Sequence, residues 1–203
     1  MYSPWKFSWI IDTDNWEFMT KLCFITGAYG VGKSTLGEQL EVKTGIRRLK
    51  ASTLIYDFLK VCPPVKKQVE GFSQLCTNQR ALISAIKLVG IEEFSLLEGH
   101  TCLVNQKGEV QKIPVHFFQE LGIAGIIVVS RNVEAIATSI FSRDGMDYSL
   151  KVVEQLQKEE LAYTKDVADV LQIPRLHIDL DSSSQASAIE KIEKFVTFSC
   201  TLM

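Results

Sequence analysis

The fold is decided by the stretch Gly27-Ala28-Tyr29-Gly30-Val31-Gly32-Lys33-Ser34. A glycine, four residues and then Gly-Lys-Ser is the spacing of a phosphate-binding loop of the Walker A type. The apolar run at residues 21–26 predicts a buried strand before the loop, and leucines at positions 36 and 40 predict a helix after it. Lys43 and Gly45 indicate where that helix ends. The motif therefore lies between a strand and a helix, which is the context that such a loop requires.

The residue types of this loop point to a nucleoside triphosphate, with ATP and Mg²⁺ as the expected ligands. Its glycines let backbone N–H groups surround phosphate oxygens, and the start of the helix adds its positive dipole end. We expect Lys33 to bridge the β- and γ-phosphates and Ser34 to offer its hydroxyl to Mg²⁺. The expected nucleotide-binding residues are Gly27, Ala28, Tyr29, Gly30, Val31, Gly32, Lys33, Ser34 and Thr35.

The rest of the sequence alternates between strand-like and helix-like segments. Further strands are predicted at residues 46–51, 94–97, 124–129 and 176–178. Helices are predicted from a cap at Ser52 or Thr53 to residue 59, at 77–89, at 115–121, at 133–141, up to about 171, and at 186–198. This alternation predicts an α/β fold of three layers, with a parallel sheet, helices on both of its faces and a small lid at residues 142–148.

Composition bounds the class of protein. The 203 residues, 46% hydrophobic and 23% charged, suit one globular domain. A net charge of -2 gives no general attraction for nucleic acid, and no apolar run approaches the roughly 20 residues that span a bilayer. Neither nucleic acid nor a membrane is therefore an expected partner. The five cysteines lack metal-ligand spacing and no basic-then-apolar leader opens the chain, so we expect a cytoplasmic protein without zinc.

The first 18 residues differ from the rest because they contain all three tryptophans. We divide the chain into an extension at residues 1–18 and a nucleotide-binding domain at residues 19–203. Two interpretations of the extension remain open. It is an addition before an alternative start at Met19, or its aromatic side chains form a strand or a patch that binds a protein partner.

Three further segments carry a family resemblance: Leu97-Glu98-Gly99-His100-Thr101, the run from Ile113-Pro114-Val115 to Leu121, and Ile126-Ile127-Val128-Val129. With the phosphate loop, they resemble the P-loop nucleoside monophosphate kinases, most closely the archaeal-type adenylate kinases, over about residues 21–178. The first segment is similar to the family's Asp-x-His-Ser/Thr, with Glu98 in place of the aspartate. The resemblance implies transfer of the γ-phosphate of ATP to a nucleoside monophosphate or a similar small acceptor.

The resemblance also implies roles for single residues. A carboxylate at a strand end beside the loop can organise Mg²⁺, so Glu98 and Ser34 are the expected metal-binding residues. Arg143 and Asp144 occupy the lid position, but Ser139-Ile140 replaces the arginine pair that the family carries before it. The expected catalytic residues are Lys33, Glu98 and Arg143. The expected acceptor-binding residues are Ser52, Thr53, Arg80 and His100.

Three functions remain open from the sequence. The first is a nucleotide kinase in which Lys33, Mg²⁺ and Arg143 stabilise the transferring charge. The second is a nucleotide-dependent switch or slow ATPase with a degenerate lid, which the missing arginine pair supports. The third is a kinase that acts on nucleic-acid ends or on a metabolite, with the same loop and another acceptor pocket.

Overall fold

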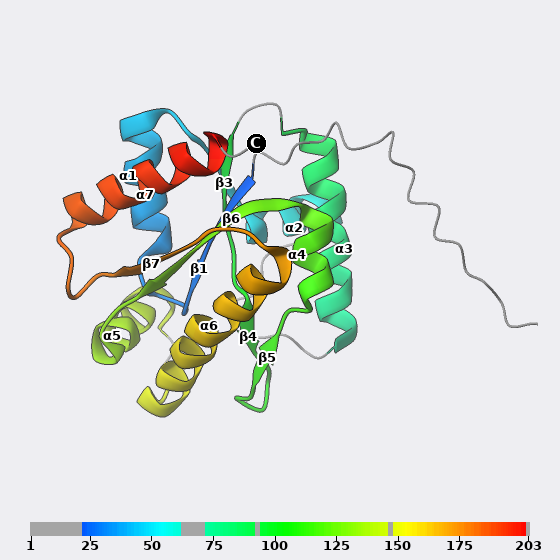
Figure 1. Ribbon diagram of the computed structural model, residues 1–203. Coiled ribbons are helices and arrows are strands. Elements are labelled where there is room, and N and C mark those ends of the chain that lie inside the picture. The colour runs from blue at the N-terminus through cyan, green and yellow to red at the C-terminus, as the bar shows by residue number, and fades with distance from the viewer. Residues whose placement is uncertain (1–21, 62–71, 92–93, 146–147, 202–203) are drawn as a thin grey trace, which may run out of the picture.

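The computed structural model describes residues 22–61, 72–91, 94–145 and 148–201. A five-stranded parallel sheet forms its centre (Figure 1), in the strand order β2-β3-β1-β6-β7. The strands are β1 Leu22–Gly27, β2 Arg47–Lys50, β3 Ser95–Glu98, β6 Ile123–Ser130 and β7 Arg175–Asp179. In the register of β1 with its neighbours, Ile25 lies beside Glu98 and Gly27 beside Val129. The carboxyl ends of the three central strands therefore meet at one edge, where ligands bind in such sheets.

Helices cover both faces of the sheet. On one face α1 (Lys33–Thr44) packs beside α7 (Gln185–Thr201). On the other, the long helix α6 (Leu150–Leu171) crosses β1, β6 and β7 and contacts α4 (Val115–Leu121) and α5 (Val133–Asp144). Helices α2 (Ala51–Leu59) and α3 (Phe72–Val89) pack against each other, and α2 also contacts β2 while α3 contacts α4.

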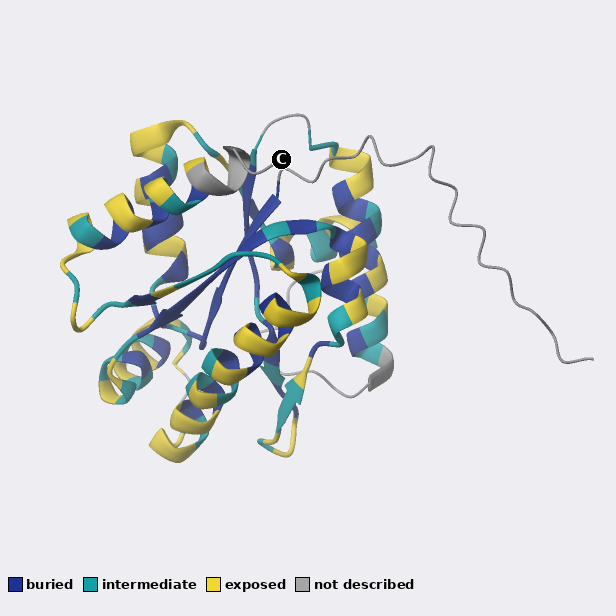
Figure 2. Cartoon of the chain, viewed as in Figure 1, coloured by how far each residue is buried: buried dark blue, intermediate teal, exposed yellow. Residues whose placement is uncertain are grey.

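The sequence of each strand matches its place in the sheet. Every residue of β1 and β3 is buried, whereas the edge strands β2 and β7 are mostly half-buried or exposed. Figure 2 shows the buried residues concentrated in the central strands and on the inner sides of the helices. Strands covered by helices on both faces need apolar residues at successive positions, which explains the unbroken apolar runs in β1 and β6.

The predicted arrangement of a parallel sheet with helices on both faces is confirmed. Several boundaries were wrong. Helix α3 starts at Phe72 instead of residue 77, and α2 starts at Ala51, so that Ser52 and Thr53 lie in its first turn rather than before it. Lys50 is the N-cap residue of α2 and makes no side-chain cap bond. The structure also contains an antiparallel hairpin of β4 (Cys102–Val104) and β5 (Val110–Lys112), which the sequence analysis did not predict.

Two predictions cannot be compared with the structure. The extension at residues 1–18 and the alternative start at Met19 lie outside the described residues.

Among the helices of the described part, none combines the length and the apolar character that crossing a membrane requires.

Candidate functional site

The phosphate-binding loop connects β1 to α1, and its glycines are required by close packing. Gly27 has φ 146° and Gly30 has φ 72°, values that side chains rarely allow. A Cβ atom at Gly27 would lie 2.4 Å from the carbonyl oxygen of Val129. One at Gly30 would lie 2.7 Å from Cγ1 of Ile140. The loop is therefore seated tightly on β6 and α5, which fixes the positions of its backbone N–H groups.

Lys33 is the first residue of α1 and is almost fully buried at the base of the loop. Its Nζ donates hydrogen bonds to the carbonyl oxygens of Gly27 at 2.8 Å and Ala28 at 3.0 Å. The N-cap residue, Gly32, has no side chain, so no side-chain oxygen caps the first turn of α1. The buried ammonium group of Lys33 and the free backbone N–H groups at the start of α1 thus lie together beside the loop, and this arrangement favours binding of an anion.

Glu98 ends β3 and connects the loop to α1 and β2. One carboxylate oxygen, Oε2, accepts a hydrogen bond from the Ser34 hydroxyl at 2.8 Å, while Oε1 accepts one from Nη1 of Arg48 at 2.9 Å. The Arg48 guanidinium also contacts Glu38 and Glu41 on α1. Glu98 is buried with only 6% of its surface exposed, and Arg48 offsets its charge.

His100 follows Glu98 by two residues and lies under the loop. Its Nδ1–H donates to the carbonyl oxygen of Gly27 at 2.9 Å, and the ring meets the edge of Tyr29, with centroids 4.6 Å apart. The hydroxyl of Tyr29 accepts a hydrogen bond from the backbone N–H of Val104 in the hairpin at 3.2 Å. Tyr29 and His100 therefore attach the phosphate loop to the β3–β4 connection and to the hairpin.

A fully buried carboxylate, Glu160 on α6, lies behind His100. It accepts hydrogen bonds from the Thr26 hydroxyl at 2.8 Å, from the backbone N–H groups of Thr101 and Cys102 at 3.2 Å, and from the Thr101 hydroxyl. Oε1 also lies 3.5 Å from Nδ1 of His100. Burial alone would raise the pKa of Glu160, but the contacts with His100 and Thr101 outweigh it and leave the pKa below its usual range.

Glu160 was not predicted as a site residue, although its position in the sequence carries a signal. The buried face of α6 repeats at helical spacing through Val153, Leu156, Glu160, Tyr163 and Val167. A carboxylate inside an apolar stripe needs buried partners, because an unpaired charge there is very unfavourable. That position could have identified Glu160 as part of a polar cluster within the core.

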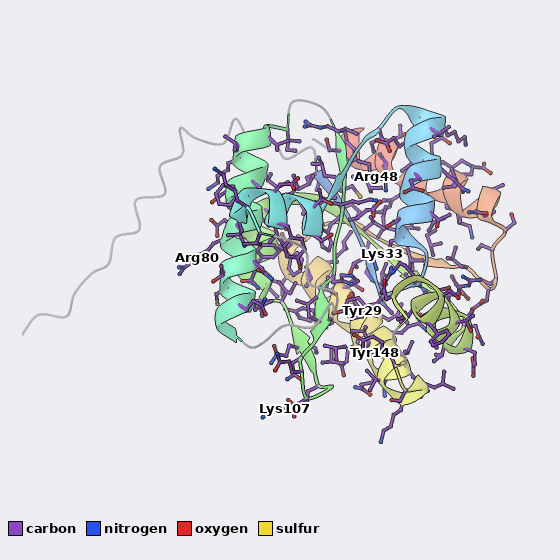
Figure 3. The ribbon with its side chains drawn as sticks, turned by 180° about the vertical axis from the view of Figure 1, so that it is seen from behind. Tyr29, Lys33, Arg48, Arg80, Lys107 and Tyr148 are labelled. Carbon is purple, nitrogen blue, oxygen red and sulfur yellow. The ribbon has the colours of Figure 1, made fainter. Side chains whose placement is uncertain are left out.

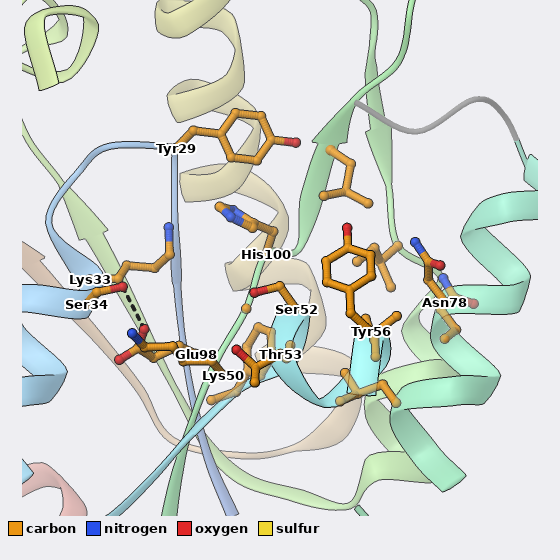
Figure 4. A pocket seen from close by; sticks show the side chains of 18 of the residues that line it. Tyr29, Lys33, Ser34, Lys50, Ser52, Thr53, Tyr56, Asn78, Glu98 and His100 are labelled. Atoms are coloured by element: carbon orange, nitrogen blue, oxygen red, sulfur yellow. Dashed lines mark hydrogen bonds between the residues drawn. The ribbon is translucent and has the colours of Figure 1, made fainter. Parts of the chain in front are cut away.

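A cavity of about 800 Å³ opens over the loop. At one end it is lined by Lys33, Ser34, Glu98 and His100, and at the other by residues of α2 and α3. Figure 4 shows Tyr56 from α2 and Asn78 from α3 facing each other at this second end, with Ser52 between them and the loop. The volume lies within the roughly 300–1,000 Å³ typical of small-molecule sites.

Most predicted site residues meet in this cavity. Its lining includes Tyr29, Gly30, Gly32, Lys33, Ser34, Thr35, Ser52, Thr53, Glu98, His100 and Arg143. Gly27, Ala28 and Val31 are not part of the lining. Arg80 also lies outside it, contrary to the prediction that it contacts the acceptor. It is exposed on the outer side of α3 and points away from the body of the protein in Figure 3, because the buried face of α3 is set by its neighbours Leu75, Gln79 and Leu82.

The prediction that Arg143 lies in a loop after Phe141 was also wrong. Helix α5 continues to Asp144, and Arg143 occupies its last turn. Its Nε donates to Oδ1 of Asp144 at 2.7 Å, with a second bond from Nη2 to Oδ2. Arg131, at the end of β6, also lines the cavity and is a second arginine near its phosphate end.

Comparison with solved structures identifies the class of fold. A shikimate kinase from Acinetobacter baumannii in complex with shikimate matches with a TM-score of 0.57 and 16% identity, covering 89% of this chain and 96% of that one. A sugar kinase from Janibacter sp. HTCC2649 matches with a TM-score of 0.54 and 14% identity, over 88% and 95% of the two chains. A gluconokinase from Sinorhizobium meliloti 1021 gives 0.51 and 12%, over 89% and 94%. The protein thus has the fold of the small P-loop kinases.

The chain belongs to the AAA domain family, whose model matches residues 26–157, more than half of its length. That range begins at the end of β1 and includes the phosphate loop, Glu98 and His100. No curated protein matches the sequence significantly. The particular closeness to archaeal-type adenylate kinases stays a prediction.

Proposed function

We propose that this protein is a small-molecule kinase that transfers the γ-phosphate of Mg-ATP to an acceptor bound between α2 and α3. The observation that carries the proposal is the shared cavity: Lys33 and Ser34 of the phosphate loop open into the same space as Ser52, Tyr56 and Asn78. A phosphate donor and a small acceptor can therefore meet without leaving the protein. Such proximity is the main contribution that a phosphotransferase makes, together with stabilisation of charge.

The residues present fit Mg-ATP. The seated glycine loop, the buried Lys33 and the start of α1 provide N–H groups and a cation for phosphate oxygens. The Ser34 hydroxyl and the Glu98 carboxylate supply the oxygen donors that Mg²⁺ prefers. When bound, Mg²⁺ would offset negative charge on the phosphates.

Different residues of the chain have different roles in the proposed phosphoryl transfer. The bond from the γ-phosphorus to the β-phosphate oxygen breaks as a bond to an acceptor oxygen forms, and ADP leaves. Lys33 holds the phosphates, Glu98 keeps Ser34 oriented, and Arg131 and Arg143 lie close enough to the cavity to offset developing charge. His100 and Tyr29 keep the loop in place from below.

The resemblance and the cavity lining bear on the nature of the acceptor. The resemblance to nucleoside monophosphate kinases makes a nucleoside monophosphate one candidate, and Ser52 and Thr53, to which the resemblance assigns acceptor binding, line the cavity. Arg80 lies outside the cavity and would not contact such a phosphate.

A panel of acceptors tests the proposal. Nucleosides, nucleoside monophosphates and simple sugar acids would be incubated with Mg-ATP, and ADP formation measured against a control without acceptor. At least one acceptor should raise ADP formation well above that control, and Lys33→Ala should abolish the increase. If every acceptor leaves the rate at the control level, the kinase proposal is wrong.

A slow ATPase or nucleotide-dependent switch is the second candidate, and one contact favours it. The paired bonds from Nε and Nη2 of Arg143 to Asp144 occupy one edge of the guanidinium, and they would have to break before that edge could contact a transferring phosphate. In this alternative, hydrolysis without an acceptor is the whole activity and the same panel gives no increase.

A further inference from the structure

The α2–α3 half of the cavity, which we define as the lining residues from Lys50 to Leu82, offers little positive charge. Among the described residues of this half, Lys50 and Asp57 are the charged ones, and they carry opposite charges. Nζ of Lys50 also lies 3.8 Å from Oε1 of Glu38 on α1. A phosphate or carboxylate group loses hydration when it enters a cavity and needs cations in return. This half therefore favours an uncharged molecule.

Apolar side chains form much of the wall around it. Leu75 and Leu82 from α3 and Phe117 from α4 line the cavity, and each of them is buried. A hydroxyl group that faces these three side chains would have no hydrogen-bond partner among them. The face of a flat ring loses no hydrogen bonds there and gains contact with the aromatic and aliphatic groups.

The polar groups of this half are the hydroxyls of Ser52, Thr53 and Tyr56 on α2 and three side-chain amides on α3. Gln74, Asn78 and Gln79 lie on α3, and all three line the cavity. Gln79 is 8% exposed, and its Nε2 has no hydrogen-bond partner among the residues that the structure describes. A buried donor without a partner is unfavourable until an acceptor atom arrives. An amide matches the adjacent donors and acceptors on the edge of a heterocycle such as a nucleobase.

We infer that this half of the cavity binds an uncharged heterocycle that carries a free hydroxyl, the chemistry of a nucleoside, with Gln79 contacting the edge of the ring. The inference rests on the proposed kinase function, because it identifies the class of acceptor at that same site. In the transfer, the nucleoside hydroxyl oxygen forms the new bond to phosphorus and gives up its proton to the solvent, while ADP leaves.

Binding and turnover are measured separately, so that the two proposals can fail separately. The full chain is saturated with a non-hydrolysable ATP analogue and Mg²⁺ and then titrated calorimetrically with adenosine, guanosine, cytidine and uridine, with their monophosphates, and with shikimate and gluconate. ADP formation is followed with the same compounds and Mg-ATP. We expect at least one nucleoside to bind at least tenfold more tightly than its monophosphate and to raise ADP formation.

Two neighbouring residues of α3 provide a matched pair of variants. Gln79→Leu should raise the Kd and KM of the preferred nucleoside about tenfold, the value of one hydrogen bond, and leave the KM for ATP within twofold. Its thermal stability should not fall, because the substitution removes an unpartnered buried donor. Arg80→Leu, on the outer side of the same helix, should change none of these quantities.

The titrations and the ADP measurements together distinguish failure of the nucleoside site from failure of the kinase function. Nucleoside binding without ADP formation would support the binding site and overturn the kinase function. Binding and turnover of a monophosphate or a sugar acid, with no nucleoside active, would overturn the inference and support the kinase function. Absence of nucleoside binding, or a Gln79→Leu variant with unchanged nucleoside Kd, would also overturn the inference.

Discussion

Replacing Gly37 with alanine tests whether the arrangement of Glu98 and Arg48 decides the behaviour of the site. Gly37 lies in the middle of α1, where glycine is less stable than alanine by about 1 kcal/mol. A Cβ atom at this position would lie 2.4 Å from Oε1 of Glu98 and 2.9 Å from Cδ of Arg48. Helix α1 accepts this glycine because a side chain would occupy the space of the ion pair.

The two effects of Gly37→Ala oppose each other. If the Glu98 carboxylate could move freely, the higher helix propensity of alanine would decide the outcome, and the free energy of unfolding would rise by about 1 kcal/mol. It is held, however, by Ser34 through Oε2 and by Arg48 through Oε1, in a strand whose residues are all buried. Overpacking typically costs about 1–3 kcal/mol, and loss of a buried ion pair costs about 3–5. We expect a net loss of about 2 kcal/mol in the free energy of unfolding.

Urea unfolding followed by far-ultraviolet circular dichroism measures this loss. A displaced Glu98 should also raise the Mg²⁺ concentration that half-saturates ATP turnover. Gln39→Ala, at an exposed position of the same helix, is the control and should change both quantities little. A Gly37→Ala protein that is as stable as the wild type, with the same Mg²⁺ dependence, would refute the reasoning.

The remaining predictions concern Lys33, Glu160 and Arg143. Lys33→Ala should weaken binding of an ATP analogue at least 100-fold in calorimetry while the circular dichroism spectrum stays unchanged, since charge-assisted bonds are worth about 1.5–3 kcal/mol each; unchanged affinity would exclude the loop as the ATP site. Glu160→Gln should lower the free energy of unfolding by about 3 kcal/mol near neutral pH. Because folding lowers the pKa of Glu160 from its usual value of 4.5, the ionised carboxylate stabilises the fold above that pH, and this stabilisation is lost as the pH falls through the folded value. The difference in unfolding free energy between the variant and the wild type should therefore shrink below pH 4.5, and a constant difference would contradict this. Arg143→Ala should lower kcat by about 10³ if the arginine acts on the transferring phosphate, and a loss below tenfold with the best acceptor would favour the switch.

The sequence predicted the part of the site that one short motif contains. The spacing around Gly30, Lys33 and Ser34 is local, and the strand and helix beside it follow from apolar periodicity. The class of fold followed from the alternation of strands and helices over the whole chain. Both inferences depend on residues close together in sequence, where pattern and structure are tightly related.

Features that depend on distant residues could not be predicted in the same way. The partnership of Arg48 with Glu98 exists because β2 and β3 are neighbours in the sheet, which no spacing in the sequence reveals. Arg80 was misplaced because the orientation of α3 depends on its packing against α2. Arg143 was misplaced because α5 extends to Asp144, past the polar residues that were read as a break.

The hydrogen bonds of Glu160 have a consequence for the order in which the protein assembles. Its carboxylate joins Thr26 at the start of the loop to Thr101 and Cys102, although α6 is the second-last helix of the chain. A fragment that ends before residue 150 would contain the whole Walker A motif but not the carboxylate that joins Thr26 to Thr101 and Cys102. This hydrogen-bond cluster behind the loop can thus form only after α6 has packed against the sheet. Hydrogen exchange at the amides of Thr101 and Cys102 should therefore occur through global unfolding rather than through local opening.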